Sequence, residues 1–192
     1  MRLFAAVLPP SAAVEELDAV VRALRALPDA DRLRWAPRES WHLTLAFYGE
    51  VGEESLPELR ERLGRAAGRS RPLALRLSGG GRFGDRALWA GAAGDLRPLR
   101  DLAQSAVAAG RRIGVPGDED RRFRPHLTLA RTRGGRWDLR PYTAALEPFD
   151  GSEWRAEELT LVRSHLPHSG VPGEQPRYEP VASWPLGGSG YL

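Results

Sequence analysis

The chain has 192 residues, and its hydrophobic content of 42% is enough to bury a core as one domain or as two closely joined lobes. It contains no cysteine, which excludes disulfides, thiolate nucleophiles and cysteine-ligated zinc. The net charge is +3, yet all 28 basic residues are Arg, and Lys and Asn are absent. This bias is typical of a GC-rich bacterial genome, so the basic charge alone does not indicate nucleic-acid binding.

The N-terminal apolar stretch over 3–8 is too short for the core of a signal peptide, and Pro9 and Pro10 interrupt it. No apolar run approaches transmembrane length. We therefore expect a soluble cytoplasmic monomer that has no membrane partner.

In the first half of the chain, the spacing of hydrophobic residues predicts alternating strands and helices. In order, these are a strand over 2–8, a helix over 11–27, a strand over 33–35, a turn over 37–40, a strand over 42–48 and a helix over 55–67. Ser11 and Ser55 are predicted N-caps, and Glu58 forms a capping box with Ser55. Gly49 is expected to end the strand that precedes it.

The second half is predicted to contain strands over 73–77 and 87–90, a helix over 96–109, a strand over 126–131, a short helix over 141–146, and strands over 158–164 and 177–184. Gly79–Gly81 is interpreted as a hairpin turn, and Gly110 as the end of a helix. Helices that alternate with pairs of short strands indicate an α+β protein with antiparallel sheets. We expect a single domain over 1–184 and a C-terminal tail over 185–192.

One five-residue string, His-Leu-Thr-Leu-Ala, occurs twice, over 42–46 and over 126–130. In a strand, residues two apart point to the same face, so each copy places an imidazole beside a hydroxyl. Two leucines then lie on the opposite face. Because the chain has only four His, two matched copies indicate two lobes that contribute equivalent groups to one site. Arginine clusters over 111–112 and 121–124 flank the second copy.

Two imidazoles on opposite sides of a phosphodiester suit in-line displacement at phosphorus. One can act as the base on the attacking oxygen and the other as the acid on the leaving oxygen, because an ordinary histidine pKa lies near neutrality. The hydroxyls of Thr44 and Thr128 can donate hydrogen bonds to non-bridging phosphate oxygens. This chemistry requires no metal and no cofactor.

Other histidines and glycines carry less information. His165 and His168 flank Pro167, which disrupts any helix that would align them as metal ligands. Gly79–Gly81 lacks the lysine that a phosphate-binding loop requires. Among the aromatic residues, Trp41 is expected in the core. Phe4 and Tyr48 are able to stack on a base but are expected to pack.

The pair of His-x-Thr strings resembles the signature of the 2H phosphoesterase superfamily. Within it, the chain is most similar to the bacterial and archaeal RNA 2′,3′-cyclic phosphodiesterases, also called 2′-5′ RNA ligases. The similarity spans about residues 1–184, and it includes the blocks over 2–6, 34–37, 42–49, 125–131 and 161–164. The segment over 169–176 departs from the usual ending of the family, because it is longer and rich in proline.

The resemblance implies a bilobal α+β fold with two small antiparallel β-sheets and flanking helices, related by a pseudo-twofold axis, and an active-site cleft between the lobes. It also implies metal-independent hydrolysis of RNA 2′,3′-cyclic phosphate ends to 2′-phosphates, and it leaves reversible 2′-5′ ligation open.

By position in the family motif, His42 would protonate the 3′ leaving oxygen and His126 would activate water. Thr44 and Thr128 would hold the phosphate. Arg131 matches an arginine that the family places near the phosphate. Strict alternation puts Arg131 opposite His126, so a strand end or a twist must re-aim it.

Two other functions stay open from the sequence. The same mechanism can act on small cyclic nucleotides or on 2′-5′-linked oligonucleotides. Alternatively, the site binds a terminal phosphate of RNA without turnover, although both histidines and both threonines are intact.

Overall fold

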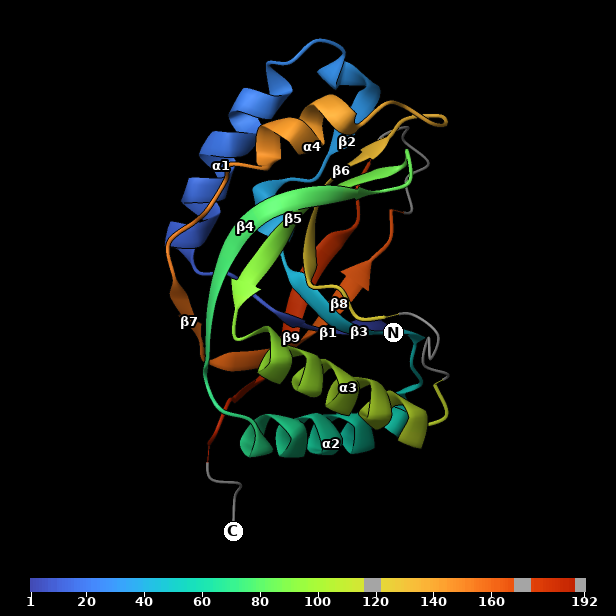
Figure 1. The fold of residues 1–192 in the computed structure, drawn as a ribbon. Helices are drawn as coiled ribbons and strands as arrows, with labels where there is room; N and C mark the ends of the chain where they lie inside the picture. Colours follow the sequence, from blue (N-terminus) through green and yellow to red (C-terminus); the bar gives the residue numbers. More distant parts are fainter. Residues whose placement is uncertain (116–121, 168–173, 189–192) are drawn as a thin grey trace.

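The computed structural model describes residues 1–115, 122–167 and 174–188, and Figure 1 shows the arrangement of the elements. The strands are β1 (Arg2–Val7), β2 (Leu33–Trp35), β3 (Leu43–Glu50), β4 (Leu73–Phe83), β5 (Ala87–Gly94), β6 (His126–Thr132), β7 (Trp154–Ala156), β8 (Glu158–His165) and β9 (Arg177–Pro185). The helices are α1 (Ser11–Arg25), α2 (Leu56–Arg69), α3 (Leu96–Arg112) and α4 (Arg140–Leu146), with 3₁₀ turns at Ala30–Arg32, Arg38–Ser40 and Glu53–Ser55.

The strands form two antiparallel sheets, and this confirms the α+β fold class. The four-stranded sheet has the order β3-β1-β8-β9, and the five-stranded sheet has the order β2-β6-β5-β4-β7. Helices α2 and α3 pack on the four-stranded sheet, whereas α1 and α4 pack on the five-stranded sheet. The chain crosses between the sheets repeatedly, so the four-stranded sheet combines β1 and β3 from the first half with β8 and β9 from the second. The lobes therefore do not coincide with the halves of the sequence.

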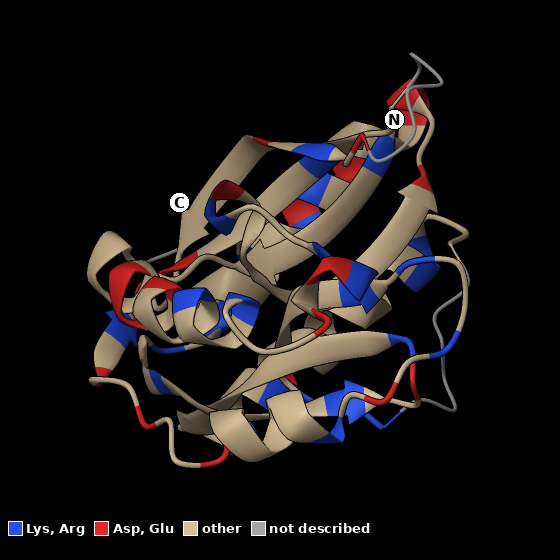
Figure 2. Ribbon diagram, turned by 90° about the horizontal axis from the view of Figure 1, so that it is seen from above, with Lys and Arg blue, Asp and Glu red and all other residues tan. Residues whose placement is uncertain are grey.

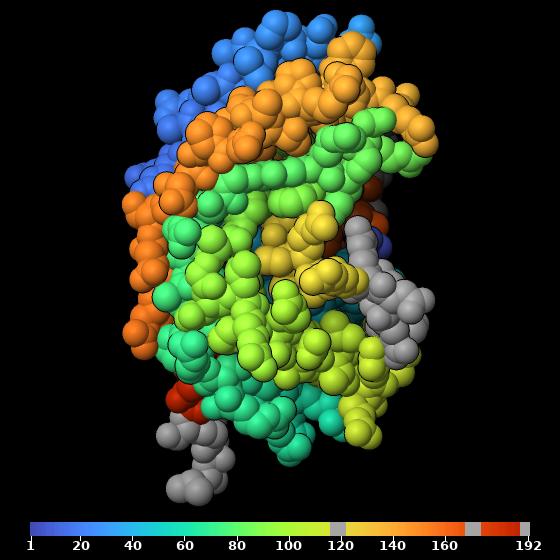
Figure 3. All heavy atoms as spheres, in the orientation of Figure 1, coloured from blue at the N-terminus to red at the C-terminus, as the bar shows by residue number. Residues whose placement is uncertain are grey.

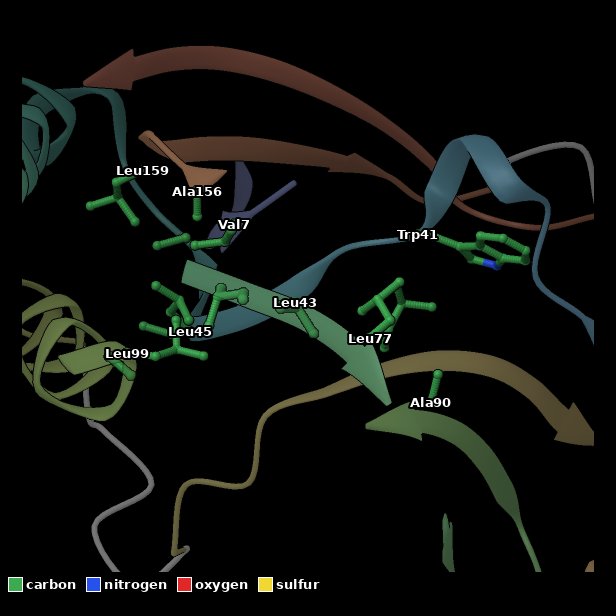
Figure 4. Close-up of a cluster of buried hydrophobic side chains, with 14 of the residues drawn as sticks. Val7, Trp41, Leu43, Leu45, Leu77, Ala90, Leu99, Ala156 and Leu159 are labelled. Atoms are coloured by element: carbon green, nitrogen blue, oxygen red, sulfur yellow. The ribbon is translucent and has the colours of Figure 1, made fainter. Parts of the chain in front are cut away.

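The core forms because the inward faces of the strands are almost entirely apolar. In β1, Leu3, Ala5 and Val7 are buried in the main hydrophobic cluster. The alternate residues Phe4 and Ala6 belong to a second, smaller cluster on the other face. Figure 4 shows the main cluster between the elements, with Leu43, Leu45, Leu77 and Leu99 among its members. Trp41 is 5% exposed, which confirms its expected place in the core.

The helix boundaries differ from the predictions in their caps. Pro10, not Ser11, occupies the N-cap position of α1, and no side chain caps this helix. Ser55 does precede α2, but its backbone is already helical and its side chain makes no capping hydrogen bond. The 3₁₀ turn at Glu53–Ser55 leads directly into α2, so the capping box predicted for Ser55 and Glu58 is wrong.

Three glycine predictions are also wrong. Gly49 lies inside β3 rather than at its end, and Gly110 lies inside α3. A Cβ on Gly110 would lie 2.8 Å from the ring of Tyr48, so this glycine allows helix and strand to approach closely. Gly79–Gly81 is part of β4 and not a hairpin turn. The β4–β5 pairing instead skips two residues between Leu77 and Gly80, and Gly79 adopts a φ of 59° there.

The short strand β7 is absent from the sequence prediction, although it pairs with β4 at the sheet edge. At the C-terminal end, β9 includes Pro185, and Leu186 is buried. The packed chain thus continues into the predicted tail over 185–192, of which residues 189–192 lie outside the described part. None of the helices in the described part of the chain is long and apolar enough to cross a membrane.

Candidate active site

A cleft of about 1680 Å³ contains all five residues that the sequence predicted for the site. His42 directly precedes β3, an edge strand of the four-stranded sheet, and His126 begins β6 of the five-stranded sheet. Strands β3 and β6 contact each other, so the two copies of the repeated string meet although 84 residues separate them. Thr44, Thr128 and Arg131 line the same cleft.

Both histidines are oriented by the same local backbone contact. Nδ1 of His42 lies 2.6 Å from the carbonyl oxygen of Ser40, and Nδ1 of His126 lies 2.7 Å from that of Arg124. Because a carbonyl oxygen only accepts, each Nδ1 donates and therefore carries a proton. In each neutral ring, Nε2 is left as the nitrogen that can accept a proton from, or return one to, a molecule in the cleft.

Each imidazole is also held between aromatic rings. The ring of His42 lies 4.6 Å from that of Phe4 and 5.1 Å from that of Tyr178, centroid to centroid. The ring of His126 lies 4.8 Å from Phe83 and 6.1 Å from Trp89. Phe4, which the sequence allowed either to stack on a base or to pack, is 3% exposed and packs against His42.

The glycines of β4 create room for one of these aromatic walls. A Cβ on Gly81 would lie 2.4 Å from the ring of Trp89, and one on Gly80 would lie 2.6 Å from its carbonyl oxygen. No other residue type fits beside Trp89 without a shift of the strand pair. The glycine run therefore has a positioning role, because it leaves the space in which the indole of Trp89 packs against His126.

Matching bulges in β3 and β6 explain how Arg131 reaches the cleft. In the β1–β3 pairing, Ala5 and Ala6 face Ala46 and Thr44, so that Leu45 is skipped. The β5–β6 pairing skips Leu129 in the same way. Each extra residue reverses the alternation that follows it, so the fifth residue after each histidine turns to the cleft face. That residue is Phe47 in β3 and Arg131 in β6, and both line the cleft. The re-aiming expected for Arg131 is thus produced by a bulge.

The polar groups beside the histidines are available to a ligand. Within the described part of the chain, the hydroxyls of Thr44 and Thr128 have no hydrogen-bond partner, and Arg131 has no ion pair. Arg131 lies close enough to Tyr178, on the opposite sheet, to lower the pKa of the phenol. Burial has the larger, opposite effect and leaves the Tyr178 pKa above its ordinary value.

Burial also distinguishes His42 electrostatically. It lowers the pKa of His42, and the proximity of His126 acts in the same direction. The hydrogen bond to the carbonyl of Ser40 opposes this shift without cancelling it. At neutral pH, His42 therefore favours its neutral form.

The charge of the cleft is uniformly positive. Its lining contains seven arginines and, among the described residues, no Asp or Glu: Arg2, Arg34, Arg100, Arg111, Arg122, Arg124 and Arg131. Elsewhere, Figure 2 shows basic and acidic residues interspersed along the chain. The sequence alone predicts no site role for most of these arginines or for Tyr178. The two arginine clusters that flank the second string, over 111–112 and 121–124, are the local signal in the sequence. Arg111, Arg122 and Arg124 of these clusters line the cleft, and Arg121 lies outside the described residues.

The segment over 169–176, which departs from the family pattern, is described from residue 174 onward, and Gln175 and Pro176 line the cleft. The side-chain amide of Gln175 donates to the carbonyl oxygen of Trp35 at 2.7 Å and so connects this segment to β2. His165 pairs with Glu179 at 2.7 Å, whereas His168 lies outside the described residues.

Tyr48 takes the packing role that the sequence analysis favoured over base stacking. Its hydroxyl donates to the carbonyl oxygen of Ala106 at 2.9 Å, and the residue is 5% exposed. The ring thus joins β3 to α3 and forms part of the cleft wall.

Comparisons with known proteins agree with this geometry. Residues 9–167 match the family model of the 2′-5′ RNA ligase superfamily. An RNA 2′,3′-cyclic phosphodiesterase of Thermus thermophilus is 34% identical over 181 residues, which cover 88% of this chain and 85% of that protein. One of Geobacillus stearothermophilus is 31% identical over 159 residues, or 81% of this chain. The match spans about half of the longer Geobacillus protein, 48% of its length.

Solved structures show the same fold. TT0787 of Thermus thermophilus superposes with a TM-score of 0.76 at 31% identity, covering 98% of this chain and 99% of that one. E. coli LigT complexed with 3′-AMP superposes with a TM-score of 0.71 at 28% identity, covering 96% of both chains. The family match extends over most of the chain and includes both histidine strands. The chain therefore belongs to the 2′-5′ RNA ligase superfamily.

Proposed function

We propose that this protein hydrolyses 2′,3′-cyclic phosphate ends of RNA to 2′-phosphates, with two histidines as acid and base and without a metal. The observation that carries the proposal is that two identical His–Thr units lie in one cationic cleft. In each unit, Nδ1 of the histidine donates a hydrogen bond to a backbone carbonyl oxygen. The curated relatives are named RNA 2′,3′-cyclic phosphodiesterases, which supports the cyclic phosphodiesterase activity in this proposal.

In the proposed step, a water attacks the cyclic phosphate and gives its proton to Nε2 of His126. The bond between phosphorus and the 3′ oxygen breaks, and His42 protonates that oxygen. Thr44, Thr128 and Arg131 donate to the non-bridging oxygens, whose negative charge increases in the transition state. A 5′-hydroxyl in place of water would give 2′-5′ ligation by the same proton transfers.

The lowered pKa of His42 is compatible with an acid role once substrate is bound. A phosphate anion beside the ring favours the charged imidazolium and so raises the pKa of His42. His42 would then be protonated mainly in the complex, where the acid is needed.

Hydrolysis of small cyclic nucleotides is the second candidate, because the structure of E. coli LigT complexed with 3′-AMP shows that a relative binds a mononucleotide. A non-catalytic RNA-end-binding module is the third. We also retain the expected cytoplasmic monomer as part of the proposal.

The decisive experiment incubates the purified protein with a short RNA that ends in a 2′,3′-cyclic phosphate. We expect hydrolysis to a 2′-phosphate, identified by chromatography against authentic 2′- and 3′-phosphate standards. A 3′-phosphate product would reverse the roles of His42 and His126. Binding of the RNA without turnover would replace the enzyme by the binding module.

A further inference from the structure

Tyr178 is a polar residue of the cleft that the proposed step does not use. It lies in β9, and its ring contacts the ring of the proposed acid, His42. The hydroxyls of Tyr48 and Tyr142 each donate to a backbone carbonyl oxygen. Within the described part of the chain, the hydroxyl of Tyr178 has no such partner. It can therefore donate to a molecule that binds in the cleft.

The ring of Tyr178 is held in place by two other aromatic rings. Its centroid lies 5.4 Å from that of Phe4 and 5.1 Å from that of His42, and its plane makes angles of 87° and 82° with theirs. Such edge-to-face pairs are a favoured aromatic arrangement. Phe4 is itself buried, so it forms a fixed support. The hydroxyl thus has a defined position beside the acid, and little ordering is needed when a substrate binds.

The backbone at Tyr178 is held from both sheets. In the four-stranded sheet, Tyr178 pairs with Ser164 of β8, which also lines the cleft. Three residues earlier, the side-chain amide of Gln175 donates to the carbonyl oxygen of Trp35 in β2, the edge strand of the five-stranded sheet. In the view that Figures 1 and 3 share, β9 lies largely behind the five-stranded sheet. Tyr178 therefore lies close to where the chain connects the two sheets.

Two arginines place positive charge near the phenol. Arg131 of β6 and Arg2 of β1 both act to lower the pKa of Tyr178, so their guanidinium groups are within electrostatic range of the hydroxyl. Burial outweighs them and raises this pKa, so the phenol keeps its proton at neutral pH. A phosphate held by Arg131 would lie near this hydroxyl, which could donate a hydrogen bond to it.

The corresponding ring beside the other histidine carries no hydroxyl. The centroid of Phe83 lies 4.8 Å from that of His126 at an interplanar angle of 87°, so each imidazole has a perpendicular aromatic neighbour. Trp89 also contacts His126, but its indole nitrogen is buried and does not reach the cleft surface. The aromatic wall of the acid half thus offers a donor that the described aromatic wall of the base half lacks.

We infer that Tyr178 is a catalytic residue whose hydroxyl donates a hydrogen bond to a non-bridging phosphate oxygen, beside Arg131. This bond strengthens as the oxygen gains negative charge in the transition state. The phenol gives up no proton, since the 3′ oxygen takes its proton from His42. The inference rests on the proposed function and adds a donor to the phosphate contacts of that site.

The test removes the hydroxyl and keeps the ring, in Tyr178→Phe. On an RNA that ends in a 2′,3′-cyclic phosphate, kcat and kcat/KM should fall together by at least about tenfold, as for a lost hydrogen bond that forms in the transition state. The alkaline limb of kcat/KM should keep its position, because the ring still buries His42. Circular dichroism should show an unchanged fold.

Tyr142→Phe is the matched control, because it removes the same atom from a tyrosine that does not line the cleft. It should leave kcat unchanged. Tyr178→Leu removes the ring as well as the hydroxyl. It should lose at least as much kcat as Tyr178→Phe. Its alkaline limb of kcat/KM should also move to higher pH, because reduced burial raises the pKa of His42.

A Tyr178→Phe protein with the kcat of the wild type would overturn the inference while leaving the phosphodiesterase proposal intact. An increase in KM alone would also overturn it, because the hydroxyl would then contact the substrate equally in the ground state and the transition state. If the wild-type protein hydrolyses no cyclic phosphate end, the proposed function fails and the inference fails with it.

Discussion

The two halves of the active site share one backbone design but differ in their surroundings. In both, a bulged strand follows a histidine whose Nδ1 bonds to the carbonyl two residues earlier. His42 is enclosed by Phe4 and Tyr178 and has a lowered pKa, whereas the hydrogen bond of His126 is exposed. The repeated string determines the geometry of each half, and residues distant in sequence set the chemical difference between them.

The largest expected effect tests whether both halves are needed. His42→Ala and His126→Ala should each reduce turnover at least about a hundredfold, as for loss of a general acid or base. Circular dichroism should show that both variants remain folded. Substantial turnover by either variant would mean that one half acts alone.

Substitutions at the fifth residue after each histidine should affect catalysis differently in the two halves of the site. Arg131→Ala should cost about 1.5–3 kcal/mol of transition-state stabilisation, because it removes a charged phosphate donor. Phe47→Ala, the matched change in β3, should leave kcat on a cyclic mononucleotide nearly unchanged. Steady-state kinetics of both variants checks this. Equal losses in kcat would show that the two positions act alike.

Substitutions of the two threonines, unlike those at the fifth positions, should affect catalysis to a similar extent in both halves. Thr44→Ala and Thr128→Ala should each weaken catalysis by about 1–3 kcal/mol, the cost of one lost hydrogen bond to phosphate. Thr→Ser variants, which keep the hydroxyl, are the controls and should stay close to the wild type. If both alanine variants match the wild type within error, the threonines merely occupy strand positions.

The pH dependence should reveal the difference in environment. With one acid and one base, the rate should follow a bell-shaped curve whose limbs belong to the coupled pair. Burial lowers the His42 pKa, and a bound phosphate raises it. The alkaline limb of kcat/KM, which reports the free protein, should therefore lie at lower pH than the alkaline limb of kcat, which reports the complex. Coincident alkaline limbs would indicate that substrate leaves the protonation of His42 unchanged.

The smallest expected effect concerns metals. Exhaustive treatment with EDTA should leave the activity of both wild-type and Thr44→Ala proteins unchanged, because hydroxyls and a guanidinium hold the phosphate. Loss of activity that zinc or manganese restores would replace the two-histidine mechanism with a metal-dependent one.

Most elements can be located from the sequence because their hydrophobic periods are strong. The prediction fails where tertiary contacts decide the local structure. The glycine run suggests a turn, yet Gly80 and Gly81 lie in β4 because Trp89 occupies the space of their side chains. Gly110 suggests a helix end, yet it lies within α3, where a Cβ would clash with Tyr48.

The residues of the repeated string can be predicted from the sequence, whereas the other residues that line the cleft cannot. His42, His126 and the threonines follow from one string, and the structure brings them to one cleft. Tyr178 and Arg100 come from β9 and α3, which only the fold brings beside that string. No local pattern marks them, since their roles depend on sheet order and helix packing.

The matching bulges have a consequence for how such a duplicated unit can diversify. In a regular strand, only the histidine, the threonine and the alanine two residues after the threonine would face the substrate. The fifth residue after the histidine would point into the core. The skipped leucines, Leu45 and Leu129, give each copy one additional outward position that is not tied to the acid–base pair. Phe47 and Arg131 show that this position tolerates an apolar ring in one copy and a guanidinium in the other. A protein engineer can therefore vary it separately in each strand and change ligand preference without rebuilding the reactive centre.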